Sequence, residues 1–557
     1  MDSRNQPGAS SASLDDSRRK MISGSAWMTA GSILSRILGA IYIIPWVTWM
    51  GAYSNQANAL FAKGYNIYSL FLMVATAGIP SAISKMVAHY NGINQYGVSR
   101  RLYHSGMYVS VAMGLVCSIL MFFGASLLDG GDPDVIPVIQ SLAWAVLVIP
   151  GMSITRGFLQ GYNWMAPSAM SQFVEQLLRV IYMLLATFVI MEMGSGNWVK
   201  AVTQSTFAAF IGALGSIVLL AYAFLRRKRE MDALVSQGEV ATGVSTRRLI
   251  GEIIYQSIPF IVIESGITLF QLIDQYTFFD IMKWFGNYSA YQLNTVYALF
   301  SFNANKLYMI IISLASAMAA TAIPLLAEAR AKNDIQDMRR QIENALLLFY
   351  FIMVPAALGL AAVAQQIYTV FYRYDAAGIT VLQFAAFMSI PYGMYTVGAA
   401  MMQGISENKK MMRFLFVGII IKFIVQVPAI WLFKGLGPLL ATAVAMLFIN
   451  YCILHSFNRE FTLHFNEMAQ PTNQILAFSL IMFAVVKVAM LLLGLVVSPY
   501  GRFTAFFTLV IGVVIGGGVF AYLALKYRLV DTLLGDRFAG LRTRFHIRQI
   551  VKFKLNI

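Results

Sequence analysis

The sequence is dominated by long apolar segments, and these limit the folds that are open to it. Fourteen windows of more than twenty mostly apolar residues follow one another between residues 22 and 526. A helix needs about 20 such residues to cross a bilayer, and in lipid a helix bonds all of its own backbone polar groups. With 58% hydrophobic residues and a mean hydropathy of +0.67, the chain is predicted to be an all-α integral membrane protein. The predicted spans are 22–50, 60–88, 103–128, 135–161, 166–191, 198–225, 250–279, 297–327, 342–366, 378–404, 411–433, 437–458, 472–497 and 502–526.

Basic residues fall on one side of these spans. With the N-terminus inside, 28 of the 41 Lys and Arg residues lie in cytoplasmic segments, and six lie in the opposite loops. This is the distribution that the positive-inside rule requires, so both termini are predicted to be cytoplasmic and the protein to lie in the plasma membrane. The six predicted outer residues are Lys63, Lys200, Lys283, Arg373, Lys434 and Arg502.

The net charge of +16 therefore does not indicate nucleic acid, because it is confined to one face of the membrane. Residues 1–20 are polar and lack an apolar core, so we expect a disordered cytoplasmic tail and no cleavable signal peptide. Residues 527–557 form a basic tail, for which we expect binding to anionic membrane lipids.

The chain also contains an internal repeat. Gln160-Gly161 and Gln403-Gly404 are 243 residues apart, and Pro80 and Pro324 are 244 apart. An even number of spans per unit keeps the orientation, so two parallel six-helix lobes related by an axis along the membrane normal are predicted, as in transporters. The predicted divisions are a tail at 1–20, an N-lobe at 21–225, a cytoplasmic linker at 226–249, a C-lobe at 250–458, two further helices at 459–526 and a tail at 527–557.

Ten charged residues stand out within the predicted spans, and an eleventh, Asp280, lies at the end of one. A charge near the bilayer midplane costs at least about 2.5 to 3.5 kcal/mol, so such residues normally face a partner or a water-filled cavity. The basic ones are Arg36, Lys85, Arg156, Arg179, Lys306, Lys422 and Lys487, and the acidic ones are Glu175, Glu264, Asp274 and Asp280.

Three of the basic residues differ in depth. Arg36 lies about 21 Å above the start of its helix, too deep to reach water along its own stem, so it is predicted to face a cavity. Lys85 and Arg156 lie close to cytoplasmic helix ends, where long stems can extend to water, although Lys85 is also a candidate for lining the cavity.

Ion pairs offer an alternative explanation for the others. Glu175 and Arg179 are four residues apart, which favours an intrahelical pair, with cavity lining by Arg179 as the alternative. Glu264 and Lys422 both lie mid-span and are predicted to pair with each other. Asp274 is expected near an outer helix end, paired with Lys306 or hydrated. Lys306 is predicted to line the cavity, and Lys487 to line an accessory groove outside the repeat.

A cavity lined by Arg36, Lys306 and either Arg179 or Lys85 would be electropositive, which suits phosphate groups. Enzyme and metal-site motifs are absent from the sequence, and the two cysteines, Cys117 and Cys452, lie in apolar runs. We therefore expect a transporter with no cofactor and no metal.

Three motifs carry a resemblance to a known family: "SRILG" at 35–39, "GIPSAISK" at 78–85 and "GFLQGYNWMAPSA" at 157–169. With the six plus six plus two plan, they resemble the polysaccharide-transport branch of the multidrug/oligosaccharidyl-lipid/polysaccharide exporter superfamily. Within it, residues 20–526 look most like the MurJ-type lipid II flippases and their SpoVB/YtgP relatives in Gram-positive bacteria.

The resemblance implies flipping of lipid II, an undecaprenyl-pyrophosphate-linked peptidoglycan precursor, from the inner to the outer leaflet by alternating access. It also implies contact with the cell-wall synthesis machinery. It assigns a cavity-facing role to Arg36 and matches Lys306 and Pro324 to a basic residue and proline of the family's eighth helix. Tyr42 stands where many relatives have a further arginine, and Lys422 occupies the region of a sodium-binding carboxylate, so a sodium site is not expected.

Three other functions stay open at this point. A flippase for another lipid-linked polysaccharide unit would share the same cavity. A cation-coupled multidrug exporter is disfavoured because the first helix carries Arg36 and no acid. A membrane-embedded glycan polymerase is disfavoured because no large outer loop carries a catalytic carboxylate.

Overall fold

The computed structural model describes residues 35, 38–76, 78–162, 164–238, 251 and 257–534. This part of the chain is helical and contains no strand. Ten of its helices are long and apolar enough to cross a membrane, or eleven if one bent pair forms a single span. A multi-pass membrane protein is thereby supported, while the count of fourteen spans stays a prediction. The chain forms two compact units that divide between Thr268 and Leu269.

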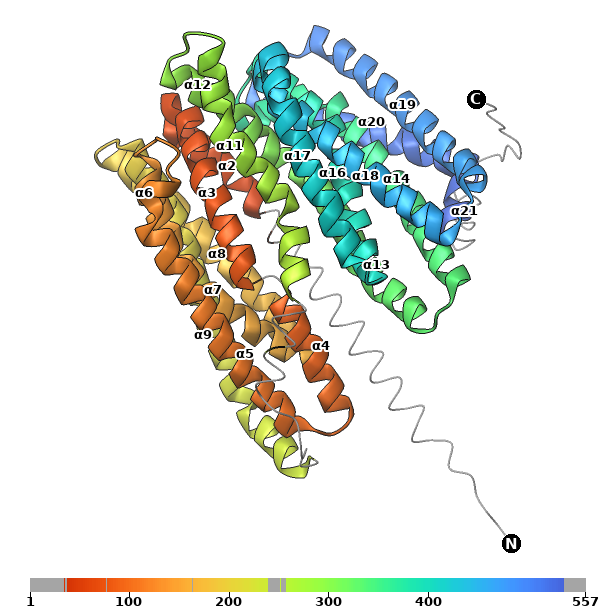
Figure 1. The fold of residues 1–557 in the computed structure, drawn as a ribbon. Coiled ribbons are helices and arrows are strands. Elements are labelled where there is room, and N and C mark those ends of the chain that lie inside the picture. Colours follow the sequence, from red (N-terminus) through yellow and green to blue (C-terminus); the bar gives the residue numbers. More distant parts are fainter. Residues whose placement is uncertain are drawn as a thin grey trace. The chain divides into compact units, whose positions relative to one another are not determined.

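The N-terminal unit is built around one central helix (Figure 1). Helix α7 (Val135–Gly161) packs against α3 (Ser54–Thr76), α4 (Ile79–Gly92), α5 (Tyr96–Phe123) and α9 (Trp198–Gln237). Its most apolar stretch is 61% buried, compared with 28% for α5. The remaining long helix, α8 (Met165–Phe188), packs mainly on α9. Short elements complete the unit: α2 (Ile43–Met50), η1 (Gly51–Tyr53), α6 (Ala125–Leu128) and the π-helical turn η2 (Val189–Met193).

The C-terminal unit repeats this plan. Its central helix, α16 (Ala376–Gly404), is also 61% buried in its most apolar stretch, and it begins and ends close to 243 residues after α7. It packs against α13 (Asn305–Ala331), α14 (Ile335–Ala362) and α18 (Gly437–Phe461). The other elements are α11 (Gly266–Trp284), α12 (Ala290–Ala298), the π-helical turn η3 (Leu299–Ala304), α15 (Ala364–Tyr372), α17 (Asn408–Phe433) and η4 (Lys434–Leu436).

Three further helices follow the repeat: α19 (Phe465–Val496), α20 (Arg502–Lys526) and α21 (Leu529–Leu534). Helix α19 packs on α14 and on α20. Only 11% of the apolar stretch of α20 is buried, and Val510, Val513 and Val514 are exposed. A helix that exposes this many apolar side chains is suited to contact with lipid.

Glycines of the repeated motif allow close helix packing in both units. A Cβ on Gly157 would lie 2.4 Å from the carbonyl oxygen of Pro80, and one on Gly161 would lie 2.9 Å from that of Ser84. In the C-terminal unit, a Cβ on Gly404 would lie 3.1 Å from the carbonyl oxygen of Ile323. Each motif therefore packs its helix against the helix that carries the repeated proline, which explains why glycine and proline recur together.

Two predicted spans are interrupted. The window at 60–88 is broken at Gly78, whose φ of +73° is a left-handed conformation that favours glycine. The window at 250–279 contains two helices, Ser257–Glu264 and α11, bent by 46°. By contrast, Pro150, Pro355 and Pro391 lie inside continuous helices.

The packing of α7 on α4 gives a first prediction. Gly157→Ala places a methyl group against the Pro80 backbone, so we expect overpacking to cost about 1–3 kcal/mol and to lower the thermal unfolding midpoint of the purified protein. Gly97→Ala is the matched control, because a Cβ there has no neighbour within 4 Å. Equal midpoints for the two variants would contradict this account.

Candidate functional site

The most deeply buried charge among the described residues is Lys422 on α17. Its side chain is 0% exposed, and its Nζ donates hydrogen bonds to Asp274 Oδ1 at 2.5 Å, Thr442 Oγ1 at 2.5 Å and the Pro438 carbonyl oxygen at 3.2 Å. An ammonium group has three protons to donate, so these acceptors satisfy it fully. The contact joins α17 to α11 and α18.

Asp274 is also held by a second residue of α17. Gln426, one turn beyond Lys422, donates from Nε2 to Asp274 Oδ1 at 2.8 Å and to Thr277 Oγ1 at 3.1 Å. The Lys422 Nζ lies 5.9 Å from the centroid of the Phe270 ring. Asp274 and Lys422 therefore form a buried, neutral and hydrogen-bonded pair, which is the arrangement that a low-dielectric interior tolerates.

This pair corrects two predictions. Lys422 pairs with Asp274 and not with Glu264, and Asp274, which is 6% exposed, pairs with Lys422 and not with Lys306. The window that ended at 279 placed Asp274 near a helix end, whereas α11 continues to Trp284 and brings Asp274 to the depth of Lys422. Glu264 lies on the preceding short helix, beyond the bend, with an exposed side chain.

The N-terminal unit contains a comparable pair on three other helices. Arg156 of α7 donates to Glu175 Oε2 at 2.7 Å, to Ser171 Oγ at 2.7 Å and to Ser216 Oγ at 2.8 Å. Its side chain is 13% exposed and that of Glu175 is 21% exposed. The prediction that Arg156 extends to water was therefore wrong, as was the intrahelical pair of Glu175 with Arg179.

Arg179 is placed among aromatic side chains. Its guanidinium carbon lies 5.4 Å from the centroid of the Tyr65 ring, and Tyr68 and Tyr42 are its other neighbours. Because the Glu175 carboxylate is bonded to Arg156, the Arg179 charge is stabilised mainly by π-faces and hydroxyl groups. Gly212 allows α9 to pack closely against this part of α8. A Cβ at Gly212 would lie 2.4 Å from the Glu175 carbonyl oxygen and 3.1 Å from Arg179 Cβ.

The other predicted cavity residues are less enclosed. Lys306 is half-buried in the first turn of α13, directly after η3, and its Nζ lies 5.3 Å from the centroid of the Phe302 ring. π-Helical turns of this kind are frequent at functional sites. Lys85 is exposed on α4. Arg36 lies outside the described residues, so its role stays a prediction.

Lys63 differs from its predicted place in an outer loop. It lies inside α3 with 4% exposure, and its Nζ is 2.7 Å from Asp132 Oδ2. Burial and the charge of Asp132 raise the pKa of the neighbouring Asp134, which lies outside the spans, while Lys63 opposes this rise. Lys63 already lies inside the window predicted at 60–88, close to its start, and α3 extends that helix back to Ser54.

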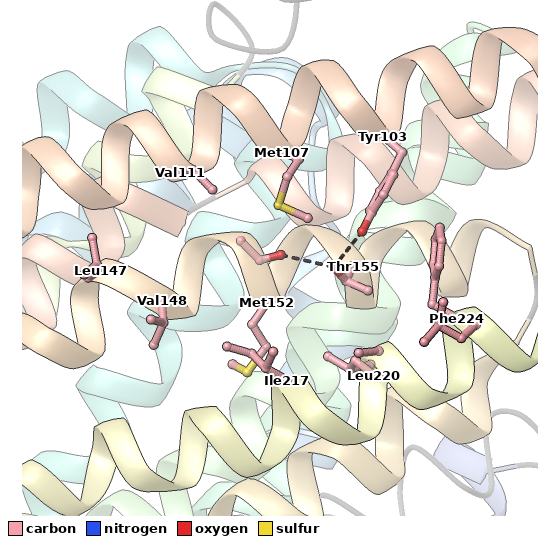
Figure 2. A pocket seen from close by; sticks show the side chains of 13 residues that line it. Tyr103, Met107, Val111, Leu147, Val148, Met152, Thr155, Ile217, Leu220 and Phe224 are labelled. Atoms are coloured by element: carbon pink, nitrogen blue, oxygen red, sulfur yellow. Dashed lines mark hydrogen bonds between the residues drawn. The ribbon is translucent and has the colours of Figure 1, made fainter. Parts of the chain in front are cut away.

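An apolar groove of about 600 Å³ lies between α5, α7 and α9 (Figure 2). The Tyr103 hydroxyl group and Thr155 Oγ1 are 3.2 Å apart in it. None of the residues described as its lining is charged. The groove therefore suits apolar chains and lacks the cations that a diphosphate needs. Among the described residues, no cluster of His, Cys, Asp and Glu could hold a metal ion.

Comparison with known proteins agrees with this architecture. Residues 21–330 match the family model for "Polysaccharide biosynthesis protein", and residues 267–427 match that for "MatE". A lipid II flippase MurJ of Bacillus subtilis (strain 168) is 32% identical over 540 residues, which are 94% of this chain and 98% of the relative.

Two solved structures share the fold. The lipid II flippase MurJ in an inward closed conformation has a TM-score of 0.61 and 15% identity, covering 90% of this chain and 98% of that one. An outward-facing multidrug resistance MATE family transporter of the MOP superfamily has a TM-score of 0.57 and 15% identity, covering 80% and 96%. The helices and the shared fold thus define a multi-pass membrane protein with the fold of MurJ and the MATE transporters. The chain belongs to the polysaccharide biosynthesis protein family and is a homologue of the lipid II flippase MurJ.

The buried pair of the C-terminal unit gives a second prediction. Lys422→Met or Asp274→Leu alone leaves one buried charge without its partner, so we expect each to cost about 3–5 kcal/mol of stability. The double variant should recover much of this loss, because neither charge remains. Thermal unfolding of the four proteins tests the pair, with Lys283→Met, at an exposed position of the same unit, as control. Losses that simply add would contradict it.

The choice of partner for Glu175 gives a third prediction. In double-mutant cycles, Arg156→Ala and Glu175→Gln should show a coupling energy of about 0.5–3 kcal/mol, because the two groups are in contact. Arg179→Ala and Glu175→Gln should show a smaller one. A larger coupling energy between Glu175 and Arg179 than between Glu175 and Arg156 would instead support the intrahelical ion pair.

Proposed function

We propose that this protein is a flippase that moves lipid II from the inner to the outer leaflet of the plasma membrane. The observation that carries the proposal is the 32% identity to a lipid II flippase MurJ over 98% of that relative. The relatives named above are a flippase and a transporter. We therefore expect this chain to be a transporter and not an enzyme.

The proposed topology has fourteen spans in two six-helix lobes and two additional helices, with both termini in the cytoplasm. Three observations support it: the one-sided distribution of Lys and Arg, the correspondence of α7 with α16, and the packing of each repeated glycine on the helix that carries the repeated proline. The predicted domain limits, including the linker at 226–249, belong to this proposal.

The proposed cargo-binding residues are Arg36, Arg179, Lys306 and Lys85. A lipid-linked pyrophosphate carries negative charge, so it would bind where cationic side chains are not already neutralised by carboxylates. Arg179 fits this requirement, because Arg156 takes the nearby carboxylate of Glu175. Lys306 is proposed for a different reason, its half-buried position in the first turn of α13 directly after a π-helical turn.

The proposed cycle does not need sodium. The ammonium of Lys422 is bound to the Asp274 carboxylate and to Thr442, so a fixed cation fills the place between these oxygen ligands. The membrane potential remains as a driving force, worth about 2.3 kcal/mol per charge per 100 mV. A strong dependence of transport on sodium would count against this part of the proposal.

Two other cargoes are tested in the same system. The first alternative is a different lipid-linked polysaccharide unit, which would bind in the same cavity. The second is a drug, because residues 267–427 match the MatE family model. Depletion of the protein should cause lipid II to accumulate in the inner leaflet if the proposal is correct. Accumulation of another lipid-linked glycan, or of an exported cationic drug, would select one of the alternatives.

A leaflet-accessibility assay for lipid II provides the fourth prediction. Arg36→Ala, Arg179→Ala and Lys306→Ala should each reduce exposure of lipid II at the outer leaflet by about tenfold or more, because each removes a charge-assisted hydrogen bond or ion pair to the phosphates. Lys283→Ala, which changes an exposed lysine, should leave exposure at the wild-type level. Wild-type exposure in all the cavity variants would refute the site, while wild-type exposure in cells depleted of the protein would refute the function.

A further inference from the structure

The apolar groove of the N-terminal unit lies outside the proposed cargo site. It is lined from α5, α7 and α9 alone, and the proposed cargo-binding residues belong to other segments of the chain. Figure 2 shows Val111 and Leu147 at one end of the groove and Tyr103 and Phe224 at the other. Under the proposed topology α5 begins and α9 ends in the cytoplasm, so the end at Tyr103 lies in the inner leaflet. This placement rests on the proposed topology and not on the cargo.

The inside of the groove suits an apolar chain. Its two polar side chains satisfy each other, because Thr155 Oγ1 lies 3.2 Å from the Tyr103 hydroxyl group and donates to the Gly151 carbonyl oxygen at 3.2 Å. Leu220 is 2% exposed and Leu225 is 66% exposed, so the groove extends from the packed interior of the unit to its surface. Its volume of about 600 Å³ falls among ligand sites of about 300–1,000 Å³. An occupant therefore needs no polar group inside the groove.

Two basic residues lie directly beyond the cytoplasmic end of the groove. Arg100 is three residues before Tyr103 on α5, and Lys228 is four residues after Phe224 on α9, so each lies one turn beyond the lining on the same helix face. Arg100 Nη1 donates to Asp232 Oδ1 at 2.9 Å, which joins α5 to α9 at this level. Lys228 is half-buried, and within the described part of the chain no carboxylate pairs with it. An apolar groove thus ends beside cations from both of its walls.

Aromatic side chains indicate that this end lies at the membrane–water interface. The guanidinium carbon of Arg227, the residue before Lys228, lies 4.3 Å from the centroid of the Trp164 ring. The Tyr162 ring stacks on Trp164 with 4.9 Å between the ring centroids. Trp and Tyr are enriched at the level of the lipid headgroups, where one side of the ring is apolar and the other is wet. Lys228 is therefore placed at the depth of lipid phosphates.

We propose that the groove and its basic end bind one anionic glycerophospholipid of the inner leaflet. An acyl chain fills the groove, and the headgroup phosphate accepts hydrogen bonds from Lys228 Nζ, with the Arg100 guanidinium as a second donor. Residues 226–232 contain four basic and two acidic side chains, so this end complements a net negative headgroup. A zwitterionic headgroup would add an ammonium group beside these cations. The bound lipid joins α5 and α9 across α7.

Native mass spectrometry of the full-length protein, titrated with single phospholipids, tests this site. Wild type should bind phosphatidylglycerol more tightly than phosphatidylcholine. Lys228→Met should weaken phosphatidylglycerol binding about tenfold, because a hydrogen bond between charged groups is lost, and Lys228→Arg should retain most of it. Arg101→Met is the matched control and should bind as wild type does. Arg101 is exposed at the same helix end, but it lies about 100° around α5 from Arg100.

The apolar part of the site is tested separately from the charge. Ala221→Phe adds a ring to the groove lining at an exposed position, so it should weaken binding of phosphatidylglycerol and phosphatidylcholine alike. Unchanged binding in Ala221→Phe would overturn the proposal. Equal losses in Lys228→Met and Arg101→Met would also overturn it, because binding would then follow the overall surface charge.

The same titration separates this site from the proposed transport cycle. Displacement of phosphatidylglycerol by undecaprenyl phosphate would overturn the proposal, because the groove would then belong to the transported lipid. Failure of the lipid site would leave the leaflet-accessibility assay for lipid II unaffected, since that assay does not depend on phosphatidylglycerol binding. The thermal unfolding midpoint shows whether each variant is folded, and Lys228→Gln replaces Lys228→Met if that variant is not.

Discussion

The cost of placing a charge in hydrocarbon organises both units. Each contains a mostly buried basic residue inside a long helix that is neutralised by a carboxylate on another helix, Arg156 by Glu175 and Lys422 by Asp274. In each pair neutral groups accept further hydrogen bonds from the cation, two serine hydroxyls from Arg156, and a threonine hydroxyl and a backbone carbonyl from Lys422. Because each pair draws on three helices, it fixes their mutual depth and rotation as well as satisfying the charge.

The sequence predicted the helices better than it predicted these partners. The limits of α7 and α20 equal the predicted windows, because length and hydropathy alone decide where a chain can cross a bilayer. The partner of Asp274 depends on its depth, and an error of five residues in the end of α11 was enough to misplace it. For Glu175, spacing along one helix favoured Arg179, whereas only the packing of α7 on α8 and α9 brings Arg156 to it.

The interruptions of helices were hidden for a related reason. The segment around Gly78 is as apolar as its flanks, so composition cannot separate α3 from α4. The left-handed conformation at Gly78 and the close approach of Gly157 and Gly161 to α4 are features of backbone geometry. The motifs "GIPSAISK" and "GFLQGYNWMAPSA" thus include one shared packing contact, and Lys85 is the only charged residue within them. The other proposed cargo-binding residues, Arg36, Arg179 and Lys306, lie outside these two motifs.

Once the two pairs are removed, the charged residues singled out within or at the ends of the predicted spans remain net positive. The basic residues Arg36, Lys85, Arg179, Lys306 and Lys487 stand against the acidic Glu264 and Asp280. An empty carrier with this excess would be drawn toward an inside-negative face, and a bound diphosphate would cancel much of the attraction. The membrane potential would then oppose outward movement of the loaded carrier less than that of the empty carrier. No coupling ion would have to move with the cargo. This asymmetry requires that Asp274 and Lys422 stay neutral as a pair through the cycle, which their burial and the hydrogen bonds of Lys422 and Gln426 to Asp274 Oδ1 favour.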